Sequence, residues 1–291
     1  MNLSKLLLPA ACGALLFLVA CGENNPIEEI KCNPLPTLTT EEAADITAVS
    51  ATLTGTIEAP TCDDSVTAKG FVYAVTETPT LADNIAAVSG EVISKEISNL
   101  ESNKSYYYRT YYTNETDTYY GEQKSFTTLV AIGQNIEGGI VFYIAPEPTD
   151  LDGDGVLDKG LICATENQSS SIAWDKGSAQ TNAATDYDLG KGASNTDKII
   201  ATHGAGNYAA SVASAYDGGD YTDWFLPSVD ELNLMYTNLH LNGLGNFSNA
   251  YYWSSTEDAT NTYARRQNFS YSWRGGDLKS STYNVRAVRA F

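Results

Sequence analysis

The chain has 291 residues, 43% of them hydrophobic and 18% charged, and this length is too great for one compact core. Its 36 acidic residues outnumber its 17 basic residues and give a net charge of −19, which excludes a general nucleic-acid binder because phosphates would be repelled. With 2 histidines and 5 cysteines, the chain has too few ligands for a zinc cage or a histidine proton relay. We therefore expect a leader and two domains that lack the chemistry of the common enzyme classes.

Residues 1–20 have the features of a secretory signal, because Lys5 precedes an apolar stretch too short to span a bilayer. The stretch ends in Leu-Val-Ala-Cys21, which resembles the bacterial lipobox and implies that the thiol of Cys21 is lipidated. The alternative is an ordinary signal peptide with a chance cysteine. Residues 21–34 are polar and acidic and resemble the tether of surface-exported lipoproteins of Bacteroidota. We expect a lipoprotein held to the outer membrane by lipid and displayed on the cell surface.

The cysteines after the lipidation site predict one disulfide. In an oxidising compartment Cys32 and Cys62, which flank the start of the next domain, are the natural pair. The alternative is that Cys32, Cys62 and Cys163 are three free, buried thiols. The sequence gives Cys163 no role.

Residues 35–129 alternate apolar and polar positions between turn residues, the pattern of a β-sandwich. The expected strands are 51–57, 68–74, 92–97, 105–113 and 124–128. Leu100, six residues before Tyr106, resembles the corner of the fibronectin type III fold, in which a turn leucine precedes the tyrosine of the next strand. The resemblance implies an all-β immunoglobulin- or fibronectin III-like sandwich. We favour a spacer that raises the next domain off the membrane over a Tyr-rich binding face.

Residues 130–291 mix strand and helix patterns. Two apolar runs, 138–144 and 160–164, predict a hairpin around an acidic loop. Ser228 and Glu231 have the spacing of a capping box, and the apolar positions that follow share one helix face. Residues 251–257 and 284–291 have strand-like patterns. The second segment is apolar enough that we expect it to be packed inside the protein.

These segments, in this order, resemble the Lcl C-terminal domain of the Legionella collagen-like adhesin. The motifs are a Gly-Gly-hydrophobic strand, DWFLPSVDELNLMY, YYWSSTE and VRAVRAF. The resemblance implies an α+β C-type lectin-like fold over residues 130–291 and, as in the namesake, binding of sulfated glycosaminoglycans. Many members carry paired cysteines before the Asp-Trp motif; residues 164–222 have none, so the loop geometry there is left open. Trp224, Trp253 and Glu231 lie inside these motifs, and we expect them in the core rather than at a sugar.

The last residues carry an excess of positive charge. From 261 to 291 there are six basic residues and one acid, whereas residues 1–260 have 11 basic and 35 acidic residues. Arginine forks suit sulfate and carboxylate groups, so an anionic glycan is expected to bind Arg265, Arg266, Arg274 and Lys279. The alternative is that these side chains pair with acidic residues elsewhere in the protein. Arg286 and Arg289 lie in the closing motif and are expected to be structural.

The acidic loop has the spacing of a calcium site. Asp150, Asp152, Asp154 and Asp158 fall at positions 1, 3, 5 and 9, with Gly155 at position 6 and the carbonyl of Val156 at position 7. Position 12 is Leu161 instead of Glu, so the loop resembles those of dockerin and thrombospondin repeats more than an EF-hand. A solvated acidic turn is the alternative, but four carboxylates this close would repel one another without a cation. We expect structural calcium.

The sequence favours a binder over an enzyme. The formylglycine-generating oxidases share the lectin-like fold but need a cysteine pair, and the second domain has only Cys163. The serine-hydrolase, zinc-protease and phosphate-loop motifs are missing from the sequence. We expect a non-catalytic adhesion or glycan-binding lipoprotein whose partner is an extracellular glycan or a surface protein. The alternative is a structural component of an outer-membrane assembly, and the sequence leaves a homo-oligomer open.

Overall fold

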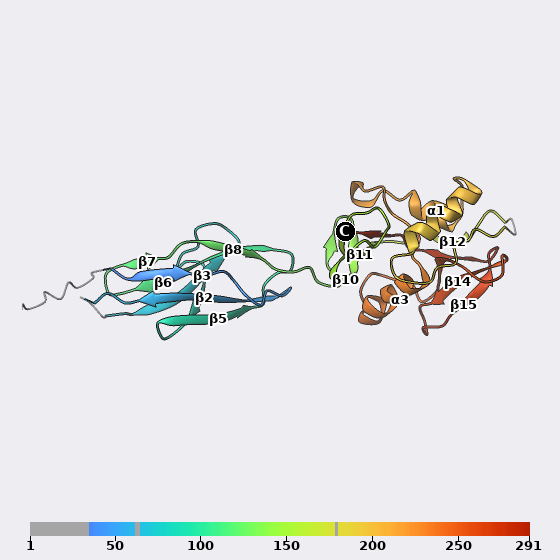
Figure 1. Cartoon of the computed structure of the whole chain (residues 1–291). Helices are drawn as coiled ribbons and strands as arrows, with labels where there is room; N and C mark the ends of the chain where they lie inside the picture. Colours follow the sequence, from blue (N-terminus) through green and yellow to red (C-terminus); the bar gives the residue numbers. More distant parts are fainter. Residues whose placement is uncertain (1–34, 62–64, 178–179) are drawn as a thin grey trace, which may run out of the picture.

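The computed structural model describes residues 35–61, 65–177 and 180–291. The predicted signal peptide and tether, the lipidation site Cys21, and the predicted disulfide partners Cys32 and Cys62 lie outside these residues. In Figure 1, strands β1–β8 lie at one end of the molecule, and β9–β17 lie with the helices at the other. None of the helices in the described part of the chain is long and apolar enough to cross a membrane.

Strands β1–β8 form two antiparallel sheets that share one core. The first sheet has the order β1-β2-β5, and the second has the order β4-β3-β6-β7 with β8 also paired to β6. Alternate residues of β2 and β6 point inward, so that Leu53 and Tyr108 meet Phe71 between the sheets. The strands are β1 Thr37–Thr40, β2 Ser50–Glu58, β3 Ala68–Ala74, β4 Asn84–Ala87, β5 Val92–Ser98, β6 Ser105–Thr113, β7 Thr118–Tyr120 and β8 Lys124–Thr127.

Strands β9–β17 form two further sheets. One has the order β17-β11-β10-β9, and the other has the order β12-β16-β13-β14-β15, with β15 at its edge. The predicted hairpin is confirmed, because β10 and β11 pair in antiparallel fashion. The strands are β9 Asn135–Ile136, β10 Gly139–Thr149, β11 Asp158–Ala164, β12 Ser169–Ala173, β13 Tyr251–Glu257, β14 Tyr263–Asn268, β15 Arg274–Leu278, β16 Thr282–Val285 and β17 Val288–Ala290.

The closing apolar segment is divided between the two sheets. β16 joins β12 and β13, whereas β17 pairs with β11, so that Leu161 lies opposite Ala290. Phe225 bridges to Val288 and fastens the Asp-Trp motif to the same strand. As expected, this segment is buried.

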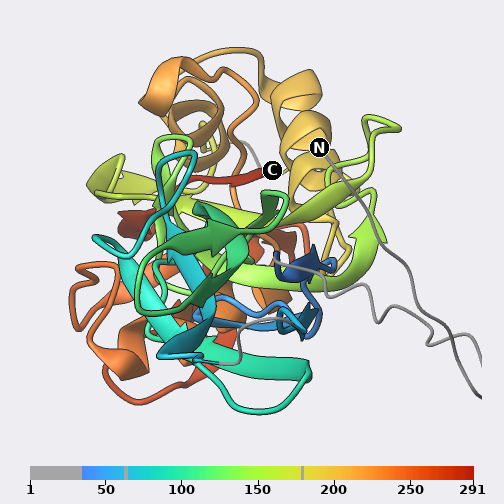
Figure 2. The same cartoon turned by 90° about the vertical axis from the view of Figure 1, so that its left-hand side faces the viewer.

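Helices pack beside these sheets, as the two views in Figures 1 and 2 show. They are α1 Gly192–His203, α2 Ala209–Ser214 and α3 Val229–Asn238, with short 3₁₀ turns at Gly218–Asp220 and His240–Asn242. The predicted capping box of α3 is confirmed, because the Ser228 side chain accepts the N–H of Glu231 and the Glu231 side chain accepts the N–H of Ser228. Two buried clusters fill this part, one around Trp174 and Trp253 and one around Phe142 and Leu232.

Candidate functional site

The sheet edge formed by β13, β14 and β15 carries three of the predicted basic residues, but it places them on two faces. Residues directly opposite in paired strands share a face, and neighbours along a strand alternate. Arg266 lies opposite both Trp253 and Gly275, whereas Arg265 lies opposite Gly276. Arg265 and Arg266 therefore point to opposite sides of the sheet.

Arg265 and Arg274 lie on the same face of the sheet, and each has an acidic partner. Arg265 Nη2 lies 3.0 Å from Asp258 Oδ1. Arg274 Nη1 lies 3.0 Å from Asp230 Oδ1 in the first turn of α3. The charge of both arginines is thus neutralised by carboxylates of the same chain.

Arg266 lies on the other face, among aromatic rings. Its guanidinium carbon is 3.7 Å from the ring centre of Tyr251, 4.7 Å from that of Tyr283 and 5.0 Å from that of Trp273. The Tyr251 hydroxyl is 2.9 Å from that of Tyr271. We call Tyr251, Tyr271, Trp273 and Tyr283 the aromatic cluster. Cation–π attraction to a partly desolvated arginine holds such rings in place.

Asp277 completes this arrangement by pairing with Arg266 at 2.6 Å. Burial alone would raise the pKa of Asp277, but hydrogen bonds from the Tyr283 hydroxyl and the Leu278 N–H, with the charge of Arg266, hold that pKa below its ordinary value. Asp277 is therefore a firm counter-ion, and Arg266 binds the cluster together instead of facing solvent.

Lys279 is 4% exposed and lies inside the protein. Its Nζ is 2.6 Å from Glu257 Oε1 and 3.7 Å from Asp175 Oδ2. Asp175 also lies 3.8 Å from His203 Nε2, and burial lowers the pKa of His203. Sequence reasoning missed this buried charge cluster because its members come from segments far apart in the chain.

The four predicted ligand-binding residues thus do not form one basic patch. Each has a carboxylate partner, which is the alternative that the charge distribution had left open. Sequence reasoning also missed two exposed aromatic side chains, Tyr271 and Trp273, which are 63% and 44% exposed. The available signal was the run of alternating aromatic and serine residues, Phe269 to Trp273, between β14 and β15.

The motif residues expected in the core are there. Trp224 and Trp253 are buried, and the Trp253 indole N–H donates to the Ile172 carbonyl at 2.9 Å. Glu231 is fully buried and accepts the N–H groups of Ser228 and Gly190. Burial raises the pKa of Glu231 to about 7, although these N–H donors act to lower it.

Two other residues keep structural positions. Arg286 is buried and donates to the carbonyls of Ala164 and Gly245 at 2.9 and 2.8 Å. Cys163 is a buried free thiol, and burial raises its pKa to about 12, so it is held in the unreactive thiol form.

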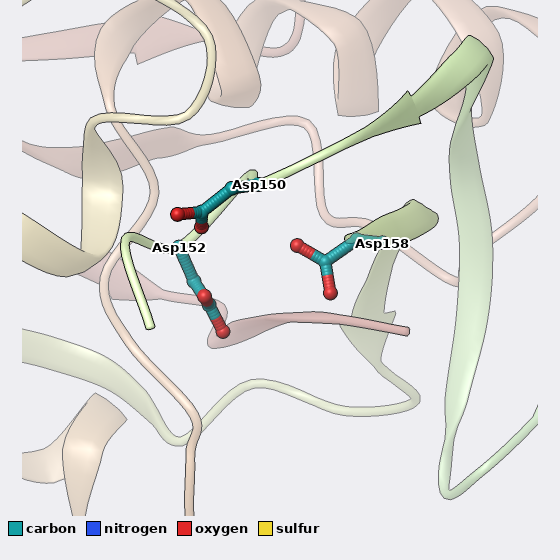
Figure 3. Close-up of side chains that lie close together, drawn as sticks. All are labelled: Asp150, Asp152 and Asp158. Atoms are coloured by element: carbon teal, nitrogen blue, oxygen red, sulfur yellow. The ribbon is translucent and has the colours of Figure 1, made fainter. Parts of the chain in front are cut away.

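The acidic loop between β10 and β11 brings three of its four predicted carboxylates together. Figure 3 shows the side chains of Asp150, Asp152 and Asp158 close together. One oxygen from each lies within 4.8 Å of the others, while Asp154 is not part of this group. Asp158 is buried and accepts the Leu151 N–H at 2.8 Å. These oxygens are the hard ligands that calcium prefers.

Electrostatic repulsion acts within this group. Desolvation raises the pKa of Asp152 and of Asp158, and the neighbouring carboxylates raise both further. Two glycines at positive φ, Gly153 and Gly155, let the chain turn tightly between the acids. Val156 follows them, at the position whose carbonyl the spacing assigns to calcium.

Comparison with known proteins identifies one part of the chain. Residues 164–289 match the family model described as the Lcl C-terminal domain. The prediction of this domain is confirmed for that segment, and it indicates an adhesin-like or carbohydrate-binding function and association with a surface.

Solved structures with detectable similarity include the sensor domain of the anti-sigma factor RsgI4 from Pseudobacteroides cellulosolvens. A short form of that domain is 20% identical and covers 33% of this chain and 96% of its own, with a TM-score of 0.26. A long form is 19% identical and covers 35% of this chain and 97% of its own, with a TM-score of 0.27. No curated protein matches the chain.

Proposed function

We propose that the chain is a non-catalytic surface lipoprotein that binds carbohydrate through residues 130–291 and mediates adhesion. The match of residues 164–289 to the Lcl C-terminal domain carries the proposal. The exposed rings of Tyr271 and Trp273 support it, because the apolar face of a sugar stacks on aromatic rings held in place.

A glycan array tests this function. The soluble chain from residue 22 onward, without lipid, should bind a defined subset of sugars. Binding to none of them, together with specific recovery of a membrane protein, would favour the alternative function as a structural component of an outer-membrane assembly.

The proposed architecture is a spacer followed by a binding domain. We assign residues 35–129 to a fibronectin type III-like sandwich and residues 130–291 to a C-type lectin-like domain. The first assignment is supported by two sheets over one core, by the burial of Leu100, and by the Tyr106 hydroxyl, which accepts the Glu101 N–H at 3.0 Å as a tyrosine corner does. The second is supported by helices packed beside two small sheets.

The proposed location is the outer membrane, with lipid on Cys21 and the domains facing outward. Its support is the leader sequence and the acidic tether of residues 21–34. Replacing Cys21 with Ala should stop lipidation, and globomycin should cause the uncleaved form to accumulate. Unchanged processing in the presence of globomycin would exclude the lipid anchor.

We also propose a structural calcium ion in the loop of residues 150–158. Three convergent carboxylates, one of them buried, support the site, since a divalent cation relieves their repulsion. The ion would fix the turn between β10 and β11.

A further inference from the structure

The aromatic cluster and its surroundings allow the ligand class to be narrowed, on the basis of the proposed carbohydrate-binding function. Of the exposed members, Trp273 is packed in place before any ligand arrives, and Tyr271 is held through its hydroxyl group. A Cβ atom at Gly275 would collide with the indole of Trp273, so that ring lies against the bare backbone of β15, and 44% of the side chain remains exposed. Tyr251 contacts the same indole edge to face, with ring centres 6.3 Å apart, and bonds the Tyr271 hydroxyl.

Rings held in this way lose little freedom on binding, which favours a weakly interacting ligand such as a sugar. The hydroxyls of Tyr251 and Tyr271 lie beside the rings and offer hydrogen bonds to sugar hydroxyls. A stacking surface with adjacent polar groups is therefore already assembled.

The charge around this surface is balanced. Arg266, which lies on this face, is paired with Asp277, whereas Arg265 and Arg274 lie on the opposite face of the sheet and Lys279 lies inside the protein. The whole chain carries a net charge of −19. A sulfated chain would have to compete with Asp277 for Arg266 and approach a negatively charged molecule, whereas an uncharged sugar would do neither.

We propose that the aromatic cluster binds an uncharged polysaccharide, with Trp273 and Tyr271 stacking on its sugar rings and Arg266 acting as a positioning residue beneath them. The positive charge of Arg266 is used to order Tyr251, Tyr283 and Trp273 and is not offered to a ligand.

Affinity electrophoresis of residues 22–291 tests the proposal, with laminarin, mannan and xyloglucan as uncharged probes and heparin as the sulfated probe. We expect retardation by at least one uncharged polysaccharide, with little change on adding salt. Trp273→Ala and Tyr271→Ala should each weaken that binding at least about tenfold, as loss of a central aromatic contact does. Tyr263→Ala is the matched control, because Tyr263 is an exposed aromatic residue of the same strand pair, 39% exposed, on the opposite face.

Thermal unfolding of each variant establishes that it is folded. Salt-sensitive binding to heparin alone would overturn the uncharged ligand and leave carbohydrate binding standing. Binding to an uncharged probe that survives both substitutions would overturn the assignment to the aromatic cluster. Binding to no probe here and to no sugar on the array would overturn the proposed function as well.

Discussion

Buried charged side chains hold the closing part of the chain in place, and Arg286 shows how. It is 1% exposed and its guanidinium bonds Asn167, Ala164 and Gly245, which belong to segments distant in sequence. The guanidinium of Arg286 can bond all of these acceptors because its N–H donors point in several directions from one planar group.

Replacing Arg286 with Ala should lower the free energy of unfolding by about 3 kcal/mol or more, because several buried acceptors lose their donor. Urea denaturation measures this change. The control is Arg274→Ala, which removes a half-exposed ion pair and should cost less than about 1 kcal/mol. Equal losses in the two variants would contradict the structural role of Arg286.

Glu231 makes stability depend on pH. Its pKa is about 7 in the folded protein, above the ordinary value of 4.5, so the folded state holds the proton more tightly than the unfolded state. The stabilisation from this proton is complete below about pH 4.5 and is lost as the pH rises through about 7.

The difference in free energy of unfolding between the wild type and Glu231→Gln should therefore fall as the pH rises from 4.5 to 7, because the variant lacks this titration. Urea denaturation at a series of pH values measures the difference. A difference that is constant across this range would show that Glu231 keeps an ordinary pKa in the folded state.

At the scale of elements, the acidic loop and the sheet edge differ in how far apart in the sequence their residues lie. The loop draws all its carboxylates from one short segment, so sequence spacing alone brings Asp150, Asp152 and Asp158 into the expected neighbourhood. Spacing did not reveal that Asp154 stands outside the group, because that depends on the turns at Gly153 and Gly155.

Calcium should raise the melting temperature of the wild type, and Asp152→Asn or Asp158→Asn should remove the shift, since each deletes a convergent charge. Asp154→Asn is the matched control and should keep most of it. Differential scanning calorimetry with and without millimolar calcium provides the measurement. No heat of binding and no shift in the wild type would exclude the site.

Strands with long alternating patterns were predictable, and short or polar elements were not. The expected runs 68–74 and 105–113 coincide with β3 and β6. The short strands β1, β4 and β7 give too few alternations to detect. Helix α1 was missed because it buries polar residues, Asn195 and Thr196, where a helical pattern would show apolar ones.

The candidate site was harder to predict because its charges are balanced across the chain. The excess of basic residues after position 260 is real in sequence, but Asp230, Glu257 and Asp258, three of the acids that neutralise it, precede that segment. The aromatic cluster likewise gathers residues from β13, β16 and the turn before β15. Only pairing of the strands brings them together.

At the scale of the whole molecule, the buried hydrophobic clusters fall into two sets that use different parts of the chain. The cluster between the first two sheets draws on residues 51–126 in its buried part, and the other two draw on residues 140–290. Each set of elements thus has a core of its own.

We expect two unfolding transitions in scanning calorimetry. Leu53→Ala should destabilise one of them by about 2–5 kcal/mol, and Leu232→Ala should do the same to the other, since both side chains are fully buried. A single transition that moves with either substitution would show that the two parts unfold together.

The pairing of β11 with β17 also sets an order of events during synthesis. Leu161 leaves the ribosome well before Ala290, its partner across the ladder, so the outer edge of β11 stays open until the intervening chain has emerged. An open edge next to an apolar strand is a site for wrong pairing between neighbouring chains. This ladder can be completed only after residues 288–290 have emerged.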